Sequence, residues 1–248
     1  MNIVLIRGLV REKYHWGSFV GELQKSFPNA NIVTPEIPGV GEFVDQVSPN
    51  TLEEMVNFMR DKVLHKITGE DNYLIAMSLG GMMARQWVEK FPNDFKQVTL
   101  VNTSFRGINP LFDRIKPISI YNFIKIFMTP GIEAREEAIV KMVSNNSVNH
   151  EVIIKDWIEI QKKRPVKRQS FINQIKGALK FKPQLDWPIH LPLMILCGKK
   201  DRLCNYKSSV ELNKKWGGKL FIHPEAGHDL PIDASPWMIE NLKEVIKE

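Results

Sequence analysis

Short apolar runs alternate with segments of helical periodicity through the first hundred residues of the chain. Runs of four to six residues predict buried strands at 3–6, 31–34, 72–77 and 97–102. Between them, apolar residues recur every three or four positions and predict helices over 16–27, 52–63 and 79–90. Because strands and helices alternate, we expect an α/β fold with a mostly parallel sheet and helices on both faces.

The alternation stops near residue 108 and resumes after residue 182. The intervening stretch carries helix signals only, in four segments that begin near residues 118, 129, 149 and 165. Beyond it, strands are predicted at 193–197 and 219–223, each followed by a helix. A connection of about 75 residues needs structure of its own. We therefore expect an α/β core made of residues 1–107 and 183–248, with residues 108–182 inserted as a four-helix cap.

One serine lies at the junction of a predicted strand and a predicted helix, in the sequence Ala76-Met-Ser78-Leu-Gly80. Because no loop separates the two elements, the pattern predicts a sharp bend with Ser78 at its apex. Such a bend brings the residues two before and two after it together, and Ala76 and Gly80 are small enough to fit. It also exposes the hydroxyl beside the free N–H groups of the helix start. Taken alone, the motif also fits a serine that merely caps a helix.

Two further polar residues follow predicted strands and are expected at the same sheet edge as Ser78. Asp201 follows the strand at 193–197, and His228 follows the last strand. In an open parallel sheet, chemistry occurs beyond the carboxyl ends of the strands. A serine hydroxyl needs an imidazole to take its proton, and a carboxylate on the other ring nitrogen fixes the imidazole tautomer. Asp229 and Asp233 lie near His228 in sequence and are the alternatives to Asp201 as that carboxylate.

Together these features resemble the α/β-hydrolase fold serine hydrolases over nearly the whole chain. The resemblance rests on the Ser78 bend, the helical insertion and four short sequences: Arg7-Gly8-Leu9, Pro38-Gly-Val-Gly41, Gly198-Lys-Lys-Asp201 and Gly227-His228. The most similar branch contains carboxylesterases and the pimeloyl-acyl-carrier-protein methyl ester esterase of biotin synthesis. The two opening strands usual in this fold are missing, so we expect about six strands. The family also usually has His-Gly where this chain has Arg7-Gly8.

The resemblance implies a role for each residue of the constellation. Ser78 would be the nucleophile that forms an acyl-enzyme, His228 the general base and acid, and Asp201 the orienting carboxylate. The main-chain N–H groups of Leu9 and Leu79 would form the oxyanion hole. The implied reaction is hydrolysis of a carboxylic ester, with no metal and no organic cofactor. Two alternatives stay open: the same triad acting on a thioester or lactone, or a ligand-binding protein that keeps the fold without turnover.

Several aromatic and apolar residues are candidates for the substrate pocket. Those in the expected cap are Phe123, Phe127, Met128 and Trp157. Their helical spacing fits a cap core equally well, because residues at that spacing pack against neighbouring helices first. Trp16 follows the expected oxyanion loop and is a further candidate for the pocket border.

The positive charge of the chain is concentrated in the expected cap. Residues 155–182 hold nine Lys or Arg residues against two acids, a local excess larger than the net charge of +6 for the whole chain. A basic helical face is ordinarily a solvated surface, but it also suits an acidic partner such as an acyl carrier protein. No nucleic-acid-binding module accompanies the basic residues.

Composition and the N-terminal sequence indicate the class of protein and its expected cellular location. A content of 43% hydrophobic and 25% charged residues is typical of a soluble globular protein. The N-terminal sequence lacks the features of a signal peptide, and no apolar run is long enough to span a bilayer, so we expect a cytoplasmic protein. Cys197 and Cys204 show no zinc-binding spacing.

Overall fold

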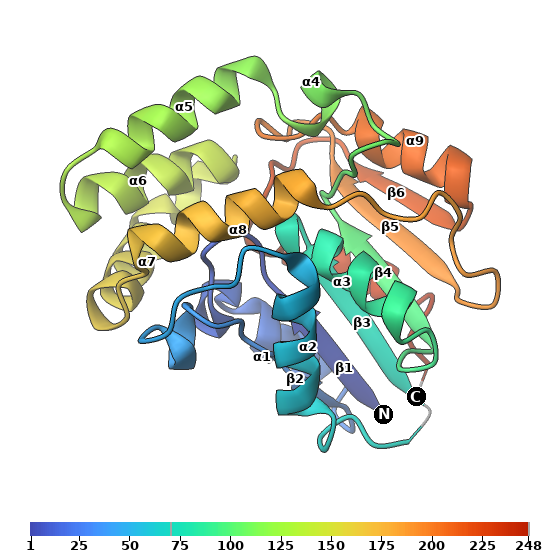
Figure 1. The fold of residues 1–248 in the computed structure, drawn as a ribbon. Coiled ribbons are helices and arrows are strands. Elements are labelled where there is room, and N and C mark those ends of the chain that lie inside the picture. The colour runs from blue at the N-terminus through green and yellow to red at the C-terminus, as the bar shows by residue number, and fades with distance from the viewer. Residues whose placement is uncertain (70, 248) are drawn as a thin grey trace.

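A single six-stranded parallel sheet forms the centre of the computed structural model, which describes residues 1–69 and 71–247 (Figure 1). The strand order is β2-β1-β3-β4-β5-β6, and every neighbouring pair runs parallel. The strands are β1 Asn2–Ile6, β2 Asn31–Val33, β3 Asn72–Met77, β4 Gln97–Val101, β5 Leu193–Gly198 and β6 Lys219–His223. The predicted α/β class and the predicted strand number are confirmed.

Side chains alternate between the two faces of the sheet and divide the core into two layers. Along β3, Leu74 and Ala76 pack into one layer, whereas Tyr73, Ile75 and Met77 pack into the other. Every residue of β1, β3, β4 and β5 is buried, as expected for parallel strands covered on both faces. The parallel pairing brings the carboxyl ends of these four strands to one edge of the sheet.

Helices cover both faces of the sheet and complete the two core layers (Figure 1). The layer that contains Leu74 is completed by α2 Leu52–Val63, α3 Leu79–Lys90 and α9 Lys207–Trp216. The opposite layer is completed by α1 Phe19–Ser26 and α11 Ser235–Leu242. Shorter turns lie at η1 Lys13–Trp16, η2 Gly41–Phe43 and α10 Leu230–Asp233. Among the described residues, no helix combines the length and the hydropathy that crossing a bilayer requires.

The helical insertion, residues 108–182, connects β4 to β5. Its elements are α4 Leu111–Arg114, α5 Pro117–Met128, α6 Ile132–Val143, η3 Ser147–Asn149, α7 His150–Lys163 and α8 Arg168–Lys180. The four longer helices match the four that the sequence predicts, and the four-residue α4 is too short for periodicity to reveal. Figure 1 shows these helices gathered beyond the carboxyl ends of the strands.

Ion pairs with a buried acid fasten the helical insertion to the loop after β1. Arg11 Nη1 lies 2.8 Å from Glu136 Oε2 of α6, and both side chains are less than a tenth exposed. The Arg11 guanidinium also lies 4.3 Å from the ring centroid of Trp157 in α7. Arg164, at the end of α7, pairs with Glu12, whose side chain is only 3% exposed. Because breaking either pair would leave a buried charge without a partner, these contacts hold the insertion over the sheet edge.

Candidate active site

Ser78 occupies a strained bend between β3 and α3. Its φ of +56° lies in the left-handed region that residues with a side chain rarely adopt. A Cβ atom on Gly80 would lie 2.5 Å from the carbonyl oxygen of Ile6 and 2.6 Å from that of Arg7, so only glycine fits there. The bend therefore has the geometry that the Ala76-Met-Ser78-Leu-Gly80 sequence predicts. The end of β1 and the first residue of the loop after it pack against the bend.

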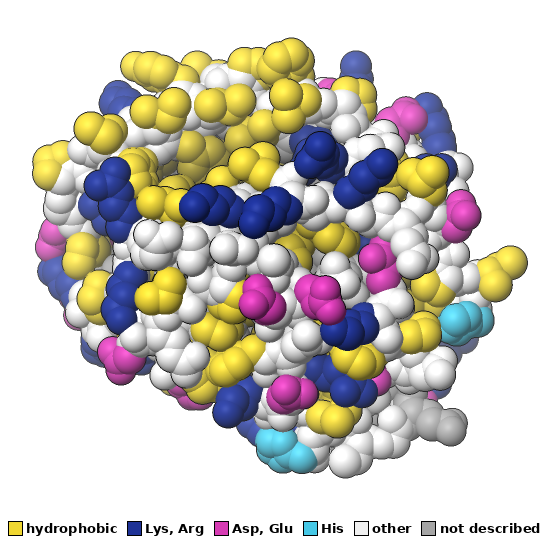
Figure 2. Space-filling model, in the orientation of Figure 1, with side chains coloured by type: hydrophobic (Ala, Val, Ile, Leu, Met, Phe, Trp, Pro, Cys, Tyr) yellow, Lys and Arg dark blue, Asp and Glu magenta, His cyan; other side chains and the backbone are white. Residues whose placement is uncertain are grey.

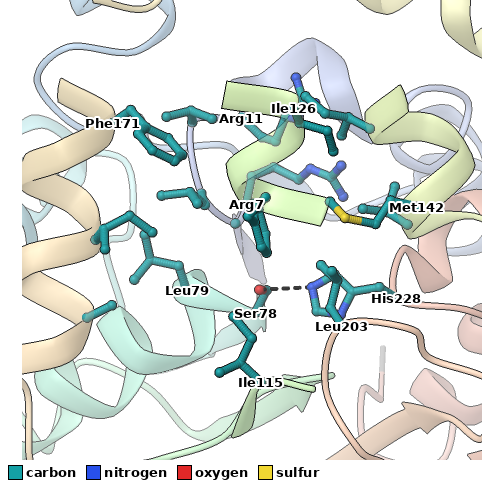
Figure 3. Close-up of a pocket in the computed structure, with 18 of the residues that line it drawn as sticks. Arg7, Arg11, Ser78, Leu79, Ile115, Ile126, Met142, Phe171, Leu203 and His228 are labelled. Carbon is teal, nitrogen blue, oxygen red and sulfur yellow. Dashed lines mark hydrogen bonds between the residues drawn. The ribbon is translucent and has the colours of Figure 1, made fainter. Parts of the chain in front are cut away.

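Hydrogen bonds join Ser78, His228 and Asp201 in a continuous chain. Ser78 Oγ lies 3.0 Å from His228 Nε2, and His228 Nδ1 lies 2.7 Å from Asp201 Oδ2 (Figure 3). Asp201 and His228 are 1% and 3% exposed. Because a carboxylate only accepts hydrogen bonds, Nδ1 carries the ring proton, and the free Nε2 lone pair faces the serine hydroxyl. The imidazole of His228 is thus within hydrogen-bond reach of both other residues that the sequence singled out.

The neighbouring acids are engaged elsewhere, which leaves Asp201 as the partner of His228. Asp201 Oδ1 accepts hydrogen bonds from the backbone N–H groups of Leu203 at 2.7 Å and Cys204 at 3.0 Å. Asp229 forms a two-pronged pair with Arg7, and Asp233 accepts the Gly227 N–H at 2.6 Å. The two alternatives that sequence reasoning left open therefore bind other groups.

Asn102 holds the loops that carry the acid and the histidine, a role that the sequence analysis missed. Its amide nitrogen donates to the carbonyl oxygens of Gly227 at 3.1 Å and His228 at 2.7 Å. Its amide oxygen accepts the Gly198 N–H at 3.0 Å, at the end of β5. Like Ser78, it has a positive φ, of 43°. A polar residue directly after the buried strand β4 was the available signal, because it predicts a side chain at the same sheet edge.

Opposing influences act on the pKa of His228. Burial lowers it, but the charge of Asp201 and its hydrogen bond raise it, with a further rise from Asp229 and a decrease from Arg7. The net result is a pKa above the ordinary histidine value of 6.5. Since the imidazolium form is the one stabilised, the ring is prepared to hold a proton received from the serine.

The loop after β1 closely approaches the serine from the other side. A Cβ atom on Gly8 would lie 3.2 Å from Ser78 Cβ and 3.6 Å from its Oγ. Leu9 and Leu79 both line the cavity at this point, and Leu79 is the first residue of α3, so its N–H has no acceptor within the helix. This chain has Arg7-Gly8 where His-Gly is usual, and the close approach of Gly8 to Ser78 is kept. The Arg7 side chain points to Asp229 instead, with Nη2 2.7 Å from Oδ2.

A cavity of about 680 Å³ opens over Ser78 between the sheet edge and the helical insertion. Figure 3 shows the apolar side chains of Leu79, Ile115 and Leu203 near the Ser78 hydroxyl, with Ile126 on the opposite side of the cavity. The four cap residues proposed from the sequence all line the cavity: Phe123, Phe127, Met128 and Trp157. The walls are mostly apolar, which suits a hydrocarbon part of a ligand.

Trp16 requires a correction, because it belongs to the core and does not line the cavity. Its side chain is 1% exposed and stacks on Phe19 with ring centroids 5.5 Å apart. The Arg7 guanidinium lies 4.9 Å from the Trp16 ring. Trp16 lies just before the amphipathic helix α1 and packs with it in the core layer that contains Tyr73. There its ring packs against Arg7 of the Arg7–Asp229 pair.

One group among the described residues has the spacing of metal ligands: Asp201, Cys204 and His228, whose donor atoms lie within 4.8 Å of one another. The Asp201 oxygens are already bound to the imidazole and to two backbone N–H groups. Burial and the charge of Asp201 raise the pKa of the Cys204 thiol, which disfavours the thiolate that a metal would need. The geometry of this group therefore suits proton transfer better than metal binding.

Residues 46–235 match the serine aminopeptidase family S33, a family of hydrolases. The chain belongs to this family. The match covers the serine bend, the helical insertion and the loops of Asp201 and His228. S33 membership and the fold place the chain among the α/β-hydrolases. No curated protein sequence matches it.

Solved structures share the fold with this S33 member at low sequence identity. The 2-hydroxy-6-oxo-6-phenylhexa-2,4-dienoate hydrolase of Rhodococcus sp. strain RHA1 aligns with a TM-score of 0.76 and 20% identity, over 98% of this chain and 89% of the other. A thermophilic esterase from Thermogutta terrifontis gives 0.76 and 17%, over 98% and 88%. A lipase-esterase related protein from Clostridium acetobutylicum ATCC 824 gives 0.69 and 16%, over 98% and 93%. These likenesses extend over nearly the whole chain, including the insertion.

Proposed function

We propose that the protein is a serine esterase that cleaves a carboxylic ester through an acyl-enzyme on Ser78. The observation that carries this proposal is the unbroken hydrogen-bond chain from Ser78 Oγ through His228 to Asp201. As Oγ attacks the ester carbonyl, His228 Nε2 takes its proton and then gives it to the departing alkoxide. Water attacks the acyl group next, with His228 again as base, and releases the carboxylic acid. Asp201 stabilises the imidazolium in both halves of the reaction.

Backbone N–H groups complete the proposed mechanism. The attack places negative charge on the former carbonyl oxygen, and Leu79 N–H lies at the positive end of α3 beside Ser78. Leu9 N–H, next to the closely packed Gly8, is the proposed second donor. Loss of one such donor in comparable serine enzymes costs about 3 to 4 kcal/mol of transition-state stabilisation.

We further propose that the insertion, residues 108–182, acts as a cap on the core formed by residues 1–107 and 183–248. Its apolar side chains face the cavity, so a bound acyl chain would displace water from around the ester. Phe123, Phe127, Met128 and Trp157 are the proposed acyl contacts. This arrangement agrees with the observation that helices α5 to α8 contribute to the cavity wall.

The charged residues of the cavity favour an ester substrate over a peptide with a free amino terminus, which is the substrate that the family name serine aminopeptidase suggests. An aminopeptidase substrate brings a positively charged ammonium group, which needs an anionic partner. The cavity has two carboxylates, and each is already paired, Asp229 with Arg7 and Glu136 with Arg11. Neither is free to bind an ammonium group without leaving a buried arginine unpaired.

A panel of p-nitrophenyl esters of increasing acyl length, with matched oxygen and sulfur esters, tests the proposed function. We expect turnover, with an optimum chain length set by the apolar cavity. Within each matched pair, we expect the oxygen ester to be cleaved faster than the sulfur ester. Preference for the thioester or a lactone would favour those alternatives. Absence of both turnover and fluorophosphonate labelling in folded protein would favour a non-catalytic ligand-binding protein.

A cytoplasmic acidic carrier protein, as in the pimeloyl-acyl-carrier-protein methyl ester esterase branch, remains the proposed macromolecular partner. Several basic side chains of α7 and α8 are available to it, although Lys162 pairs with Glu133 and Arg164 with Glu12. Neutralising Lys163, Lys167 and Arg168 is expected to slow hydrolysis of a carrier-bound ester more than that of the free ester. An equal decrease for both esters would contradict this partner.

The raised pKa of His228 predicts the pH dependence of the reaction. Protonated His228 cannot accept the serine proton, so kcat/KM should fall as the pH decreases through the pKa of this residue. Because Asp201 raises that pKa, the midpoint should lie above 6.5 and move down in Asp201→Asn. Initial rates with a neutral ester across pH 5 to 9 at constant ionic strength measure it; a wild-type midpoint below 6.5 would contradict the assignment.

A further inference from the structure

The cavity over Ser78 contains more arginine charge than its own acids neutralise. Its arginines come from the loop after β1 and from α4, α6 and α8, and they are Arg7, Arg11, Arg114, Arg135 and Arg168. Its acids are Glu136 and Asp229, and both are used: Asp229 binds Arg7 at 2.7 Å and 3.1 Å, and Glu136 lies 2.8 Å from Arg11. Three arginines therefore face the cavity without a carboxylate partner in the described part of the chain.

Arg114, at the end of α4, is the most enclosed of these three. Arg135 and Arg168 are exposed at the rim, whereas Arg114 is half-buried and its Nε atom is shielded from solvent without a hydrogen-bond partner. Arg114 forms no ion pair with any described residue. Burial is the main influence on the pKa of its guanidinium and lowers it, but arginine stays charged in proteins. A charge withdrawn from water without a counterion is costly, and a bound anion would remove that cost.

Arg114 lies between the residues Ser78, His228 and Asp201 and the outside of the molecule. Its carbonyl oxygen accepts a hydrogen bond from Cys204 Sγ at 3.0 Å, and that sulfur lies within 4.8 Å of the donor atoms of Asp201 and His228. With Leu111 and Leu179, Arg114 also lines a second, smaller hollow. Arg114 thus lies in the wall between the Ser78 cavity and the surface.

A second cation shares that outer hollow. Arg106 lines it together with Arg114, and the positive charge of Arg106 also disfavours the charged form of Arg114. Two arginines that repel each other and lack an acid are the arrangement that carboxylate and phosphate groups bind. Figure 2 shows Lys and Arg side chains along the edge of a hollow whose interior is hydrophobic, so the cavity combines an apolar interior with a cationic margin.

We propose that Arg114, assisted by Arg106, binds an anionic group at the end of the substrate remote from the ester. The substrate class is then an ester that carries a carboxylate or a phosphate, with the apolar segment between the two groups lying in the cavity. This inference rests on the proposed ester hydrolysis at Ser78. It also explains why the cavity is a poor site for an ammonium-bearing substrate.

The test compares esters that differ only in the remote group. Half-esters of straight-chain dicarboxylic acids are compared at each length with analogues that end in a carboxamide, a phosphate or an ammonium group. We expect kcat/KM for the carboxylate or the phosphate series to exceed that for the carboxamide series by about tenfold or more, with the ammonium series slowest. The better of the two anionic series identifies the source of the negative charge.

Variants then assign the preference to Arg114. Arg114→Gln should reduce the ratio of anionic to carboxamide kcat/KM to about threefold or less, and Arg114→Lys should retain more of it. Lys214→Gln removes one exposed charge from α9 and should leave the ratio as in the wild type. Equal kcat/KM for anionic and carboxamide esters in the wild type, or an unchanged ratio in Arg114→Gln, would overturn the proposal.

Binding to the inactive Ser78→Ala protein separates this inference from the proposed function. Calorimetry should show the anionic ester binding about tenfold more tightly than its carboxamide analogue, whether or not the wild type turns over either one. If neither ester is hydrolysed but this difference is found, ester hydrolysis fails and the anion site stands. If both are hydrolysed and bound equally well, the anion site fails and ester hydrolysis stands.

Discussion

Ser78→Ala is expected to lower kcat for ester hydrolysis by about 10⁴-fold or more, with little change in KM. The hydroxyl is the atom that would become acylated, and His228 Nε2 at 3.0 Å has no other role in the proposed first step. The oxyanion donors and the cavity remain, so substrate should still bind. Steady-state kinetics with the preferred p-nitrophenyl ester measures the effect.

Two controls make the Ser78→Ala result specific. Ser147→Ala makes the same chemical change at an exposed position in η3 and should leave kcat within about twofold, as surface substitutions usually do. The thermal midpoint of Ser78→Ala should stay close to that of the wild type, because alanine keeps the Cβ atom at the φ of +56° and loses only the hydroxyl that bonds His228. Retention of more than a tenth of the wild-type kcat would rule out Ser78 as the nucleophile.

Asp201→Asn is expected to lower kcat by about 10⁴-fold while the protein stays folded. An amide in place of the carboxylate can donate to His228 Nδ1, which favours the tautomer whose proton lies on Nε2 and so blocks proton acceptance from Ser78. The amide oxygen can still accept the backbone N–H groups of Leu203 and Cys204, which limits the structural effect. Kinetics and urea unfolding of the same preparation separate the two effects.

Asp229→Asn is the matched comparison, because Asp229 adjoins His228 in sequence but its carboxylate binds Arg7 and not the imidazole. It leaves the buried guanidinium of Arg7 without its counterion, so we expect a loss of about 3 kcal/mol or more in the free energy of unfolding. Its kcat per folded molecule should exceed that of Asp201→Asn by a large factor. The reverse pattern, with Asp229→Asn inactive and Asp201→Asn active, would assign the catalytic carboxylate to Asp229.

The fold and the central constellation could be predicted from the sequence because local rules determine them. Buried strands read as apolar runs, and the tight junction at Ser78 requires small residues at fixed offsets, of which Gly80 has no room for a side chain. The position of Asp201 and His228 follows from the parallel topology, which brings strand ends together. These rules need no knowledge of which side chains meet across the core.

Pairings between distant side chains could not be predicted in the same way. Arg7 and Asp229 are 222 positions apart, and their bond depends on how the first and last loops pack. Periodicity indicates which face of a helix is apolar but not what it contacts, so Trp16 was expected at the pocket border and lies in the core. Arg114 likewise has no ion-pair partner among the described residues, and this could not be predicted, because the fold decides which acids lie near it.

The most direct test of the central claim is to identify the residue that a fluorophosphonate modifies. Labelled protein is digested and the adduct located by tandem mass spectrometry, with Ser78→Ala and Asp201→Asn treated in parallel. The proposed mechanism predicts one adduct, on Ser78, absent in Ser78→Ala and formed far more slowly in Asp201→Asn. An adduct on another serine, or folded protein that resists labelling, would contradict the assignment of Ser78 as a catalytic nucleophile.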